Sequence, residues 1–133
     1  MPAANGYSNP RSLARIFGTL ACGGELDGVR ILEERTIEDA TSSVVTGPWY
    51  QGEFSPLLAK IRFGRGFQLN SELMYMGPNP RAFGHSGGGG AMAWADPESQ
   101  VSFAYTPNLF DMDISRMYDR ANELSKCVFD CLR

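Results

Sequence analysis

Residues 83–105 read FGHSGGGGAMAWADPESQVSFAY, and this stretch decides the fold. Runs of apolar and β-branched residues bounded by Gly, Pro and Asp predict three strands, at about Arg81–Gly87, Gly90–Ala95 and Gln100–Thr106. The turn Asp96-Pro97-Glu98-Ser99 joins the last two strands. The glycines at the end of the first strand have no Cβ, so a ligand or another backbone can come close there.

The segments on either side of these strands predict helices. Asn9 followed by Pro10 is typical of a helix start, and apolar residues then recur three and four apart until Gly23-Gly24 ends the pattern. A second short helix is expected from Glu33 to about Ser42, with acidic residues early, where the helix dipole favours them. An apolar stripe from Ile114 to Leu132, with Asp113 as N-cap, predicts a last helix. We therefore expect an α+β fold, with an antiparallel sheet flanked by helices in one domain over residues 1–133.

Between the second helix and the strands the pattern is less regular. The stretch Val44–Leu58 is punctuated by Gly and Pro and predicts an irregular loop. Its aromatic residues could line the mouth of a substrate site or pack as a local cluster; they are Trp49, Tyr50 and Phe54. Phe63–Leu69 predicts one short strand that contains glycine, and Met76–Pro80 predicts a turn.

Composition excludes several classes of function. The 133 residues are 43% hydrophobic and 20% charged, with a net charge of −3 and no basic run, which argues against a nucleic-acid partner. No stretch is long and apolar enough for a membrane span, and residues 1–6 lack the features of a signal peptide, so a cytoplasmic location is favoured. The odd cysteine count fits reduced thiols. Cys127 and Cys131 lie four apart on the last helix and could form half a metal site, but we expect buried core cysteines there, no metal and no cofactor.

Several ordered segments resemble one known family. Residues 5–17, NGYSNPRSLARIF, and residues 20–32, LACGGELDGVRIL, resemble the second half of the serine β-lactamase-like family, which includes class C β-lactamases and related esterases. Phe63–Phe67 and Phe83–Gly87 resemble later landmarks of that family. The resemblance runs from about Ala3 to Asn108. It implies a partial β-lactamase/transpeptidase-like fold and serine hydrolase chemistry on ester, amide or peptide acyl groups.

The resemblance also implies roles for the glycine-rich strand. His85-Ser86-Gly87 stands at the position of the family's K-T-G motif. The backbone N–H of Gly88 would then be one of two oxyanion donors, and such a donor stabilises the charge of the tetrahedral intermediate. His85, Ser86 and Gly87 would contact the substrate. His85 replaces the usual Lys, and this departure weakens the case for recognising a carboxylate through a fixed cation.

The family's nucleophile motif, S-x-x-K, does not occur in this sequence. The motif needs Ser and Lys three apart so that they share one helix face and the amine can take the hydroxyl proton. Tyr7-Ser8-Asn9 fits the family's Y-x-N motif by letter, but it leads directly into the first helix, and we interpret it as a loop with a helix cap. Ser86 is adjacent to His85, and neighbouring side chains on a strand face opposite sides, so the two cannot form a simple dyad.

Three interpretations follow. The chain is a C-terminal portion of a β-lactamase-like serine hydrolase that is inactive alone, or a non-catalytic protein that binds an acyl or peptide ligand. In the third interpretation, this chain associates with a separate N-terminal half and restores the active site.

The resemblance further implies that the strand Gln100–Thr106 pairs with N-terminal strands that these 133 residues lack. Its edge carries Val101, Phe103 and Tyr105 and would be unpaired, so we expect self-association through this edge.

Overall fold

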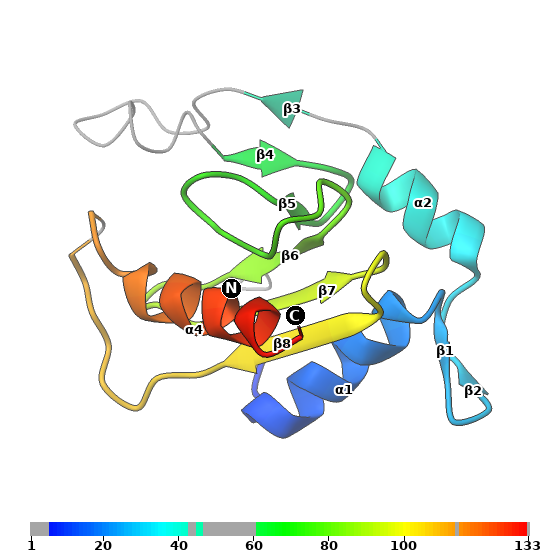
Figure 1. The fold of residues 1–133 in the computed structure, drawn as a ribbon, viewed down its shortest axis with the longest axis horizontal. Coiled ribbons are helices and arrows are strands. Elements are labelled where there is room, and N and C mark those ends of the chain that lie inside the picture. The colour runs from blue at the N-terminus through cyan, green and yellow to red at the C-terminus, as the bar shows by residue number, and fades with distance from the viewer. Residues whose placement is uncertain (1–5, 43–44, 47–60, 114, 133) are drawn as a thin grey trace.

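The computed structural model describes residues 6–42, 45–46, 61–113 and 115–132 (Figure 1). The α+β fold expected from the sequence is confirmed, because an antiparallel sheet lies among helices. The helices are α1 (Pro10–Ala21), α2 (Glu34–Ser42) and α4 (Asp119–Asp130). The strands are β1 (Glu25–Leu26), β2 (Val29–Arg30), β3 (Val45–Thr46), β4 (Arg62–Phe63), β5 (Gln68–Leu69), β6 (Phe83–Ser86), β7 (Met92–Asp96) and β8 (Val101–Tyr105).

Six of the strands form one antiparallel sheet in the order β3-β4-β5-β6-β7-β8, and β1 pairs with β2 in a separate hairpin. The three strands predicted from residues 83–105 are confirmed as β6, β7 and β8. Gly84 pairs with Trp94, and Trp94 pairs with Phe103, so these three residues share one face of the sheet. All five residues of β7 are buried, whereas all five of β8 are partly exposed at the sheet edge.

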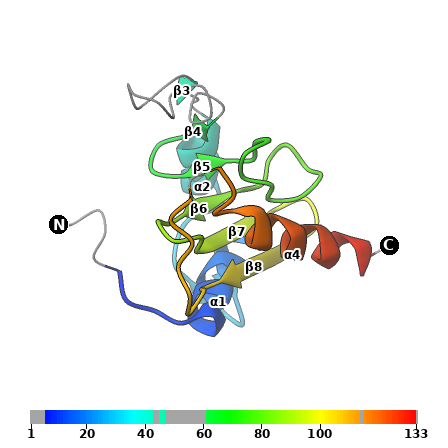
Figure 2. The ribbon, with the colours of Figure 1, turned by 90° about the vertical axis from the view of Figure 1, so that its left-hand side faces the viewer.

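The helix α1 begins and ends where the sequence predicts. The side chain of Asn9 accepts a hydrogen bond from Ser12 N at 2.9 Å, Pro10 occupies the first helical position, and Gly23 and Gly24 follow the helix with φ of 72° and 91°. The helix packs closely on β7 and β8 (Figures 1 and 2). Its close approach is possible because the facing residues are small, and Ser102 Oγ donates to Ala14 O at 2.8 Å.

The other face of the sheet packs against α4. The Trp94 ring stacks between Phe103 and Phe129, with centroid distances of 5.6 Å and 5.5 Å. Its Nε1–H donates to Ser125 Oγ at 2.9 Å, so the one polar atom of this buried ring is satisfied. The helix is therefore fixed to the sheet through both apolar and polar contacts of a single strand residue.

The start and the buried face of the last helix differ from the prediction. The helix begins at Asp119, and Asp113 instead stabilises a preceding turn, where its Oδ1 accepts from Ser115 N at 3.0 Å and from Ser115 Oγ at 2.6 Å. The buried residues of α4 are Ala121, Ser125 and Phe129, whereas Leu124 and Leu132 of the predicted stripe are 43% and 58% exposed. Ala121 belongs to the predicted stripe, whereas Ser125 and Phe129 do not, and these two residues contact the buried Trp94 ring.

Two further expectations were wrong. Phe63–Leu69 is not one strand, because Gly64 N donates to Phe67 O at 2.9 Å and Gly66 adopts φ +96°, which folds the segment into the β4–β5 hairpin. Cys127 and Cys131 are exposed rather than buried in the core. Within the described ranges, no group of three or more potential metal ligands occurs and no helix is long and apolar enough to cross a membrane. Most of the predicted loop Val44–Leu58 lies outside the described residues.

Candidate active-site strand

The candidate site lies where β6 runs into the glycine turn. Ser86 is the last residue of β6, and its side chain is buried. Its backbone N–H and its hydroxyl both donate to Gln68 Oε1, at 2.6 Å and 2.9 Å. The neighbouring strand β5 supplies Gln68, which is itself buried. The hydroxyl of Ser86 is thus occupied in holding two strands together and does not face a ligand in this structure.

His85 faces the opposite side of the sheet and is exposed, as the alternation of side chains along a strand requires. Its Nδ1 lies 2.6 Å from Ser86 O. A carbonyl oxygen can only accept, so this contact requires a proton on Nδ1. In the neutral ring, Nε2 is then an acceptor directed away from the backbone. The imidazole can therefore accept a hydrogen bond or a proton from a group placed over this face.

The four glycines after β6 form a tight turn. Gly87 N donates to Ala91 O at 2.8 Å, and Gly90 N donates to Gly87 O at 3.2 Å. Gly89 and Gly90 have φ of +84° and +95°, a region that favours glycine. A Cβ on Gly89 would lie 2.7 Å from the Phe110 ring, and one on Gly90 would lie 2.4 Å from Met117 O. The turn therefore needs glycine both for its dihedral angles and for space.

Gly88 differs from its neighbours. It is exposed, its φ lies outside the left-handed region, and a Cβ there would meet nothing within 4 Å. Among the described residues, no acceptor is hydrogen-bonded to its backbone N–H. This N–H is therefore an open donor in the turn that follows β6, three residues after the exposed His85. An open backbone donor at such a position can stabilise negative charge that develops on a ligand oxygen.

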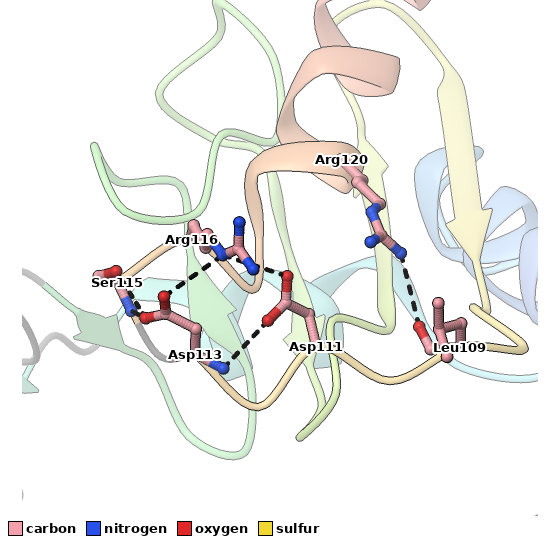
Figure 3. Close-up of polar contacts among 6 residues, drawn as sticks. All are labelled: Leu109, Asp111, Asp113, Ser115, Arg116 and Arg120. Carbon is pink, nitrogen blue, oxygen red and sulfur yellow. Dashed lines mark hydrogen bonds and ion pairs between the residues drawn. The ribbon is translucent and has the colours of Figure 1, made fainter.

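A loop between β8 and α4, whose internal polar contacts Figure 3 shows, also contacts the glycine turn. Asp111 N donates to Gly89 O at 3.3 Å, and the Phe110 ring lies against Gly89. The loop is braced by Arg116, whose Nε lies 3.5 Å from Asp111 Oδ2 and 3.3 Å from Asp113 Oδ2. The hydrogen bond from the Ser115 side chain lowers the pKa of Asp113, which helps to keep this carboxylate charged as a partner for Arg116. The position of the turn thus depends on contacts far away in sequence.

The structure places the predicted site residues in two groups. His85 on β6 and Gly88 in the turn after it are exposed and Gly87 is partly buried, whereas Ser86 is buried on the opposite face of β6 from His85. Tyr7 is 96% exposed, and Asn9 caps α1, which confirms the interpretation of this segment as a loop with a helix cap. The aromatic residues of the predicted loop, Trp49, Tyr50 and Phe54, lie outside the described residues.

Sequence reasoning missed the supporting residues of this site. Gln68 holds Ser86, and Phe110 with Asp111 holds Gly89. The only signal for Gln68 is a polar residue within a short apolar strand pattern. Nothing in the local pattern of residues 107–113 indicates that they contact a turn about 20 residues earlier.

Comparison with known proteins decides the family. A model of the beta-lactamase family matches residues 1–126 of the chain. This chain belongs to the beta-lactamase family. The esterase/beta-lactamase LipL of Mycobacterium tuberculosis (strain ATCC 25618 / H37Rv) is 36% identical over 111 residues, which cover 81% of this chain and 23% of LipL.

Solved structures agree with this beta-lactamase-family assignment. A penicillin-binding protein homologue from Caulobacter crescentus has 35% identity and a TM-score of 0.68, and the match covers 89% of this chain and 32% of that protein. A family VIII carboxylesterase has 33% identity and a TM-score of 0.66, covering 87% and 31%. The chain thus spans about a quarter to a third of the length of these relatives, and it has the fold of one part of a beta-lactamase domain.

Proposed function

We propose that this chain forms the C-terminal part of a β-lactamase-like serine hydrolase that cleaves ester, amide or peptide acyl groups. The chain supplies one wall of the acyl pocket, and the nucleophile comes from residues outside these 133. The observation that carries the proposal is the open N–H of Gly88 in the turn that follows the exposed His85 of β6. The similarity to an esterase/beta-lactamase and to a family VIII carboxylesterase supports acyl chemistry.

Each residue of the wall has a distinct task in this proposal. The N–H of Gly88 donates to the substrate oxygen that becomes negative in the tetrahedral intermediate, and it gains strength as that charge grows. His85 presents Nε2 over the same side and accepts a hydrogen bond from the substrate. Gly87 lets the acyl group approach the backbone, since a Cβ on it would meet only Ala91. Ser86 contributes indirectly, because its bonds to Gln68 fix the end of β6.

The printed sequence contains no S-x-x-K motif. Its two lysines are Lys60 and Lys126, and the residues three positions earlier are Leu57 and Glu123. Ser86 is buried and bonded to Gln68, on the opposite face from His85. A general base must lie within hydrogen-bond reach of the hydroxyl whose proton it removes. The adjacent histidine and serine do not meet this condition.

We therefore expect the purified chain to leave p-nitrophenyl butyrate intact, with a release of p-nitrophenol equal to that of buffer. Ser86→Ala is the matched variant, because it removes the hydroxyl of the residue that follows His85. Turnover by the wild-type chain that disappears in Ser86→Ala would show that Ser86 is a nucleophile and would contradict the proposal.

The role of Gly88 is tested in a restored domain, in which the chain is fused behind the preceding segment of the Caulobacter relative. Gly88→Pro deletes the N–H, and Gly88→Ala keeps it in the same open space. Loss of one oxyanion donor lowers kcat by about 10²–10³-fold, so we expect that loss in the proline variant and a much smaller one in the alanine variant. Equal kcat values in the two variants would remove Gly88 N–H from the mechanism.

A second function is favoured by the bonded hydroxyl of Ser86, which is unsuited to nucleophilic attack. The chain would then bind an acyl or peptide ligand without turnover, in the manner of a pseudoenzyme. Titration of the isotope-labelled chain with butyrate distinguishes this function, because the ligand carboxylate imitates the oxyanion. A saturable shift of the Gly88 amide resonance without ester turnover would support it, and an unchanged resonance would exclude it.

A further inference from the structure

The peptide group between Gly89 and Gly90 is hydrogen-bonded at both ends. Its carbonyl oxygen, Gly89 O, accepts from Asp111 N at 3.3 Å, and its N–H, that of Gly90, donates to Gly87 O at 3.2 Å. Both glycines are buried, so these two bonds lie away from bulk water. This single peptide group therefore connects the loop between β8 and α4 with the start of the glycine turn.

The peptide group between Gly87 and Gly88 carries the open donor of the candidate site. Its oxygen accepts the bond from Gly90 N, and its N–H is that of Gly88. A trans peptide group is planar, so its C=O and N–H bonds point in opposite directions. The bond that holds Gly87 O inside the turn therefore directs Gly88 N–H out of the turn.

We propose that Asp111 is a positioning residue for the N–H of Gly88. Its backbone N–H starts a row of two hydrogen bonds, which passes through the Gly89–Gly90 peptide and ends at the Gly87–Gly88 peptide. Hydrogen bonds in such a row polarise one another, by about 10–30% per bond. The row thus makes Gly88 N–H a better directed and stronger donor to an oxyanion. The inference rests on the function proposed above and names the segment that controls its donor.

The loop holds Asp111 through the carboxylate of that residue as well as through its backbone (Figure 3). The Asp111 side chain is only 18% exposed, its Oδ1 accepts from Asp113 N at 3.1 Å, and its Oδ2 lies 3.5 Å from Arg116 Nε. The neighbouring Phe110 ring packs on Gly89, where it would lie 2.7 Å from an added Cβ. Because these contacts fix the backbone of Asp111, a change in the loop is transmitted to the turn.

Asp111→Pro and Asp111→Ala make the first matched pair of variants. Both remove the carboxylate, and only proline removes the N–H. The readout is amide hydrogen exchange of the purified chain, followed by NMR. Gly90 N–H should exchange at least about tenfold faster in the proline variant than in the alanine variant, because the turn opens more often when Gly89 O loses its partner. Gly87 N–H, which donates to Ala91 O, should exchange equally in both. Equal exchange of Gly90 in the two variants would overturn the proposal.

A second pair avoids proline, which also restrains the residue before it. Asp111→Asn keeps an oxygen that can accept from Asp113 N, and Asp111→Ala does not. Gly90 N–H should be protected in the asparagine variant as in the wild type, and it should exchange at least about threefold faster in the alanine variant. The same exchange rate in both variants would show that the side chain of Asp111 does not position the turn. Thermal melts check that every variant is folded.

The consequence for catalysis is measured in the restored domain described above. Asp111→Pro should lower kcat by about three- to tenfold relative to Asp111→Ala, less than deletion of the donor itself, because the row improves Gly88 N–H without supplying it. KM should not change, since the bond to the oxyanion forms fully only in the transition state. In a Gly88→Pro background, Asp111→Pro should have no further effect on kcat, because the two changes act through one donor.

These measurements separate the inference from the proposed function. If Gly88→Pro lowers kcat and the two Asp111 variants have equal kcat values, the donor acts without control by the loop and the inference fails alone. If Gly88→Pro leaves kcat unchanged, the proposed role of the donor fails. Hydrogen exchange of Gly90 in the isolated chain then still decides whether Asp111 holds the turn, because that readout requires no catalysis.

Discussion

Gly84→Ala is expected to prevent the sheet from forming. A Cβ on Gly84 would lie 2.1 Å from Ala93 O and 2.7 Å from Trp94 Cα, both of which are backbone atoms of the paired strand. The clash cannot be relieved by a side-chain rotation, and separating the strands would break the β6–β7 ladder. Overpacking a core costs about 1–3 kcal/mol and occasionally more. We expect a loss at or above the upper end of this range.

Gly88→Ala is the matched control, because it adds the same methyl group four residues later in open space. Urea unfolding of the two variants should show a stability close to wild type for Gly88→Ala. It should show a large decrease in the unfolding midpoint, or no folded protein, for Gly84→Ala. Similar midpoints for the two variants would mean that β6 and β7 do not approach each other as described here.

The parts of the fold that the sequence predicts correctly depend on short-range chemistry. The helix α1 is specified by its Asn9 cap, Pro10 and the glycines after it, all within a few residues of the helix ends. The strands β6, β7 and β8 are specified by apolar runs with turn residues between them. Each of these signals acts over less than about ten residues, which is the range over which a pattern can be read without knowing the tertiary contacts.

The parts that the sequence does not predict depend on contacts between distant segments. The buried face of α4 includes Ser125 and Phe129, which contact Trp94 from about 30 residues earlier in the sequence. The sequence of residues 63–69 is compatible with a continuous strand or with a hairpin. The hairpin forms, and the hydrogen bond from Gly64 N to Phe67 O closes it. Apolar periodicity alone cannot rank such alternatives.

The same division applies to the candidate site. The glycine run and the opposite orientation of His85 and Ser86 are predictable, because glycine content and strand alternation are local properties. The orientation of Ser86 toward Gln68 is not, because β5 and β6 are separated by a long connection. This difference matters chemically, since it directs the hydroxyl of Ser86 away from the face that carries His85.

Trp94→Ala is expected to lower the free energy of unfolding by about 3–5 kcal/mol, the range for deleting a large buried aromatic side chain. The ring is fully buried and stacks on Phe103 and Phe129, so its removal leaves a cavity between the sheet and α4. A small domain is stable by about 5–15 kcal/mol in total. The loss is therefore a large part of the stability, and urea unfolding followed by far-UV circular dichroism measures it.

Two variants on α4 separate the polar from the apolar part of this contact. Ser125→Ala removes the acceptor of the buried Trp94 Nε1–H and should cost about 1–3 kcal/mol, because that donor is then unsatisfied. Leu124→Ala, at the adjacent and 43% exposed position, should cost less than about 1 kcal/mol. If Leu124→Ala proved as damaging as Ser125→Ala, the helix would have to face the sheet through the stripe that the sequence predicts. The order of these two losses therefore reports directly on how α4 is rotated against β7.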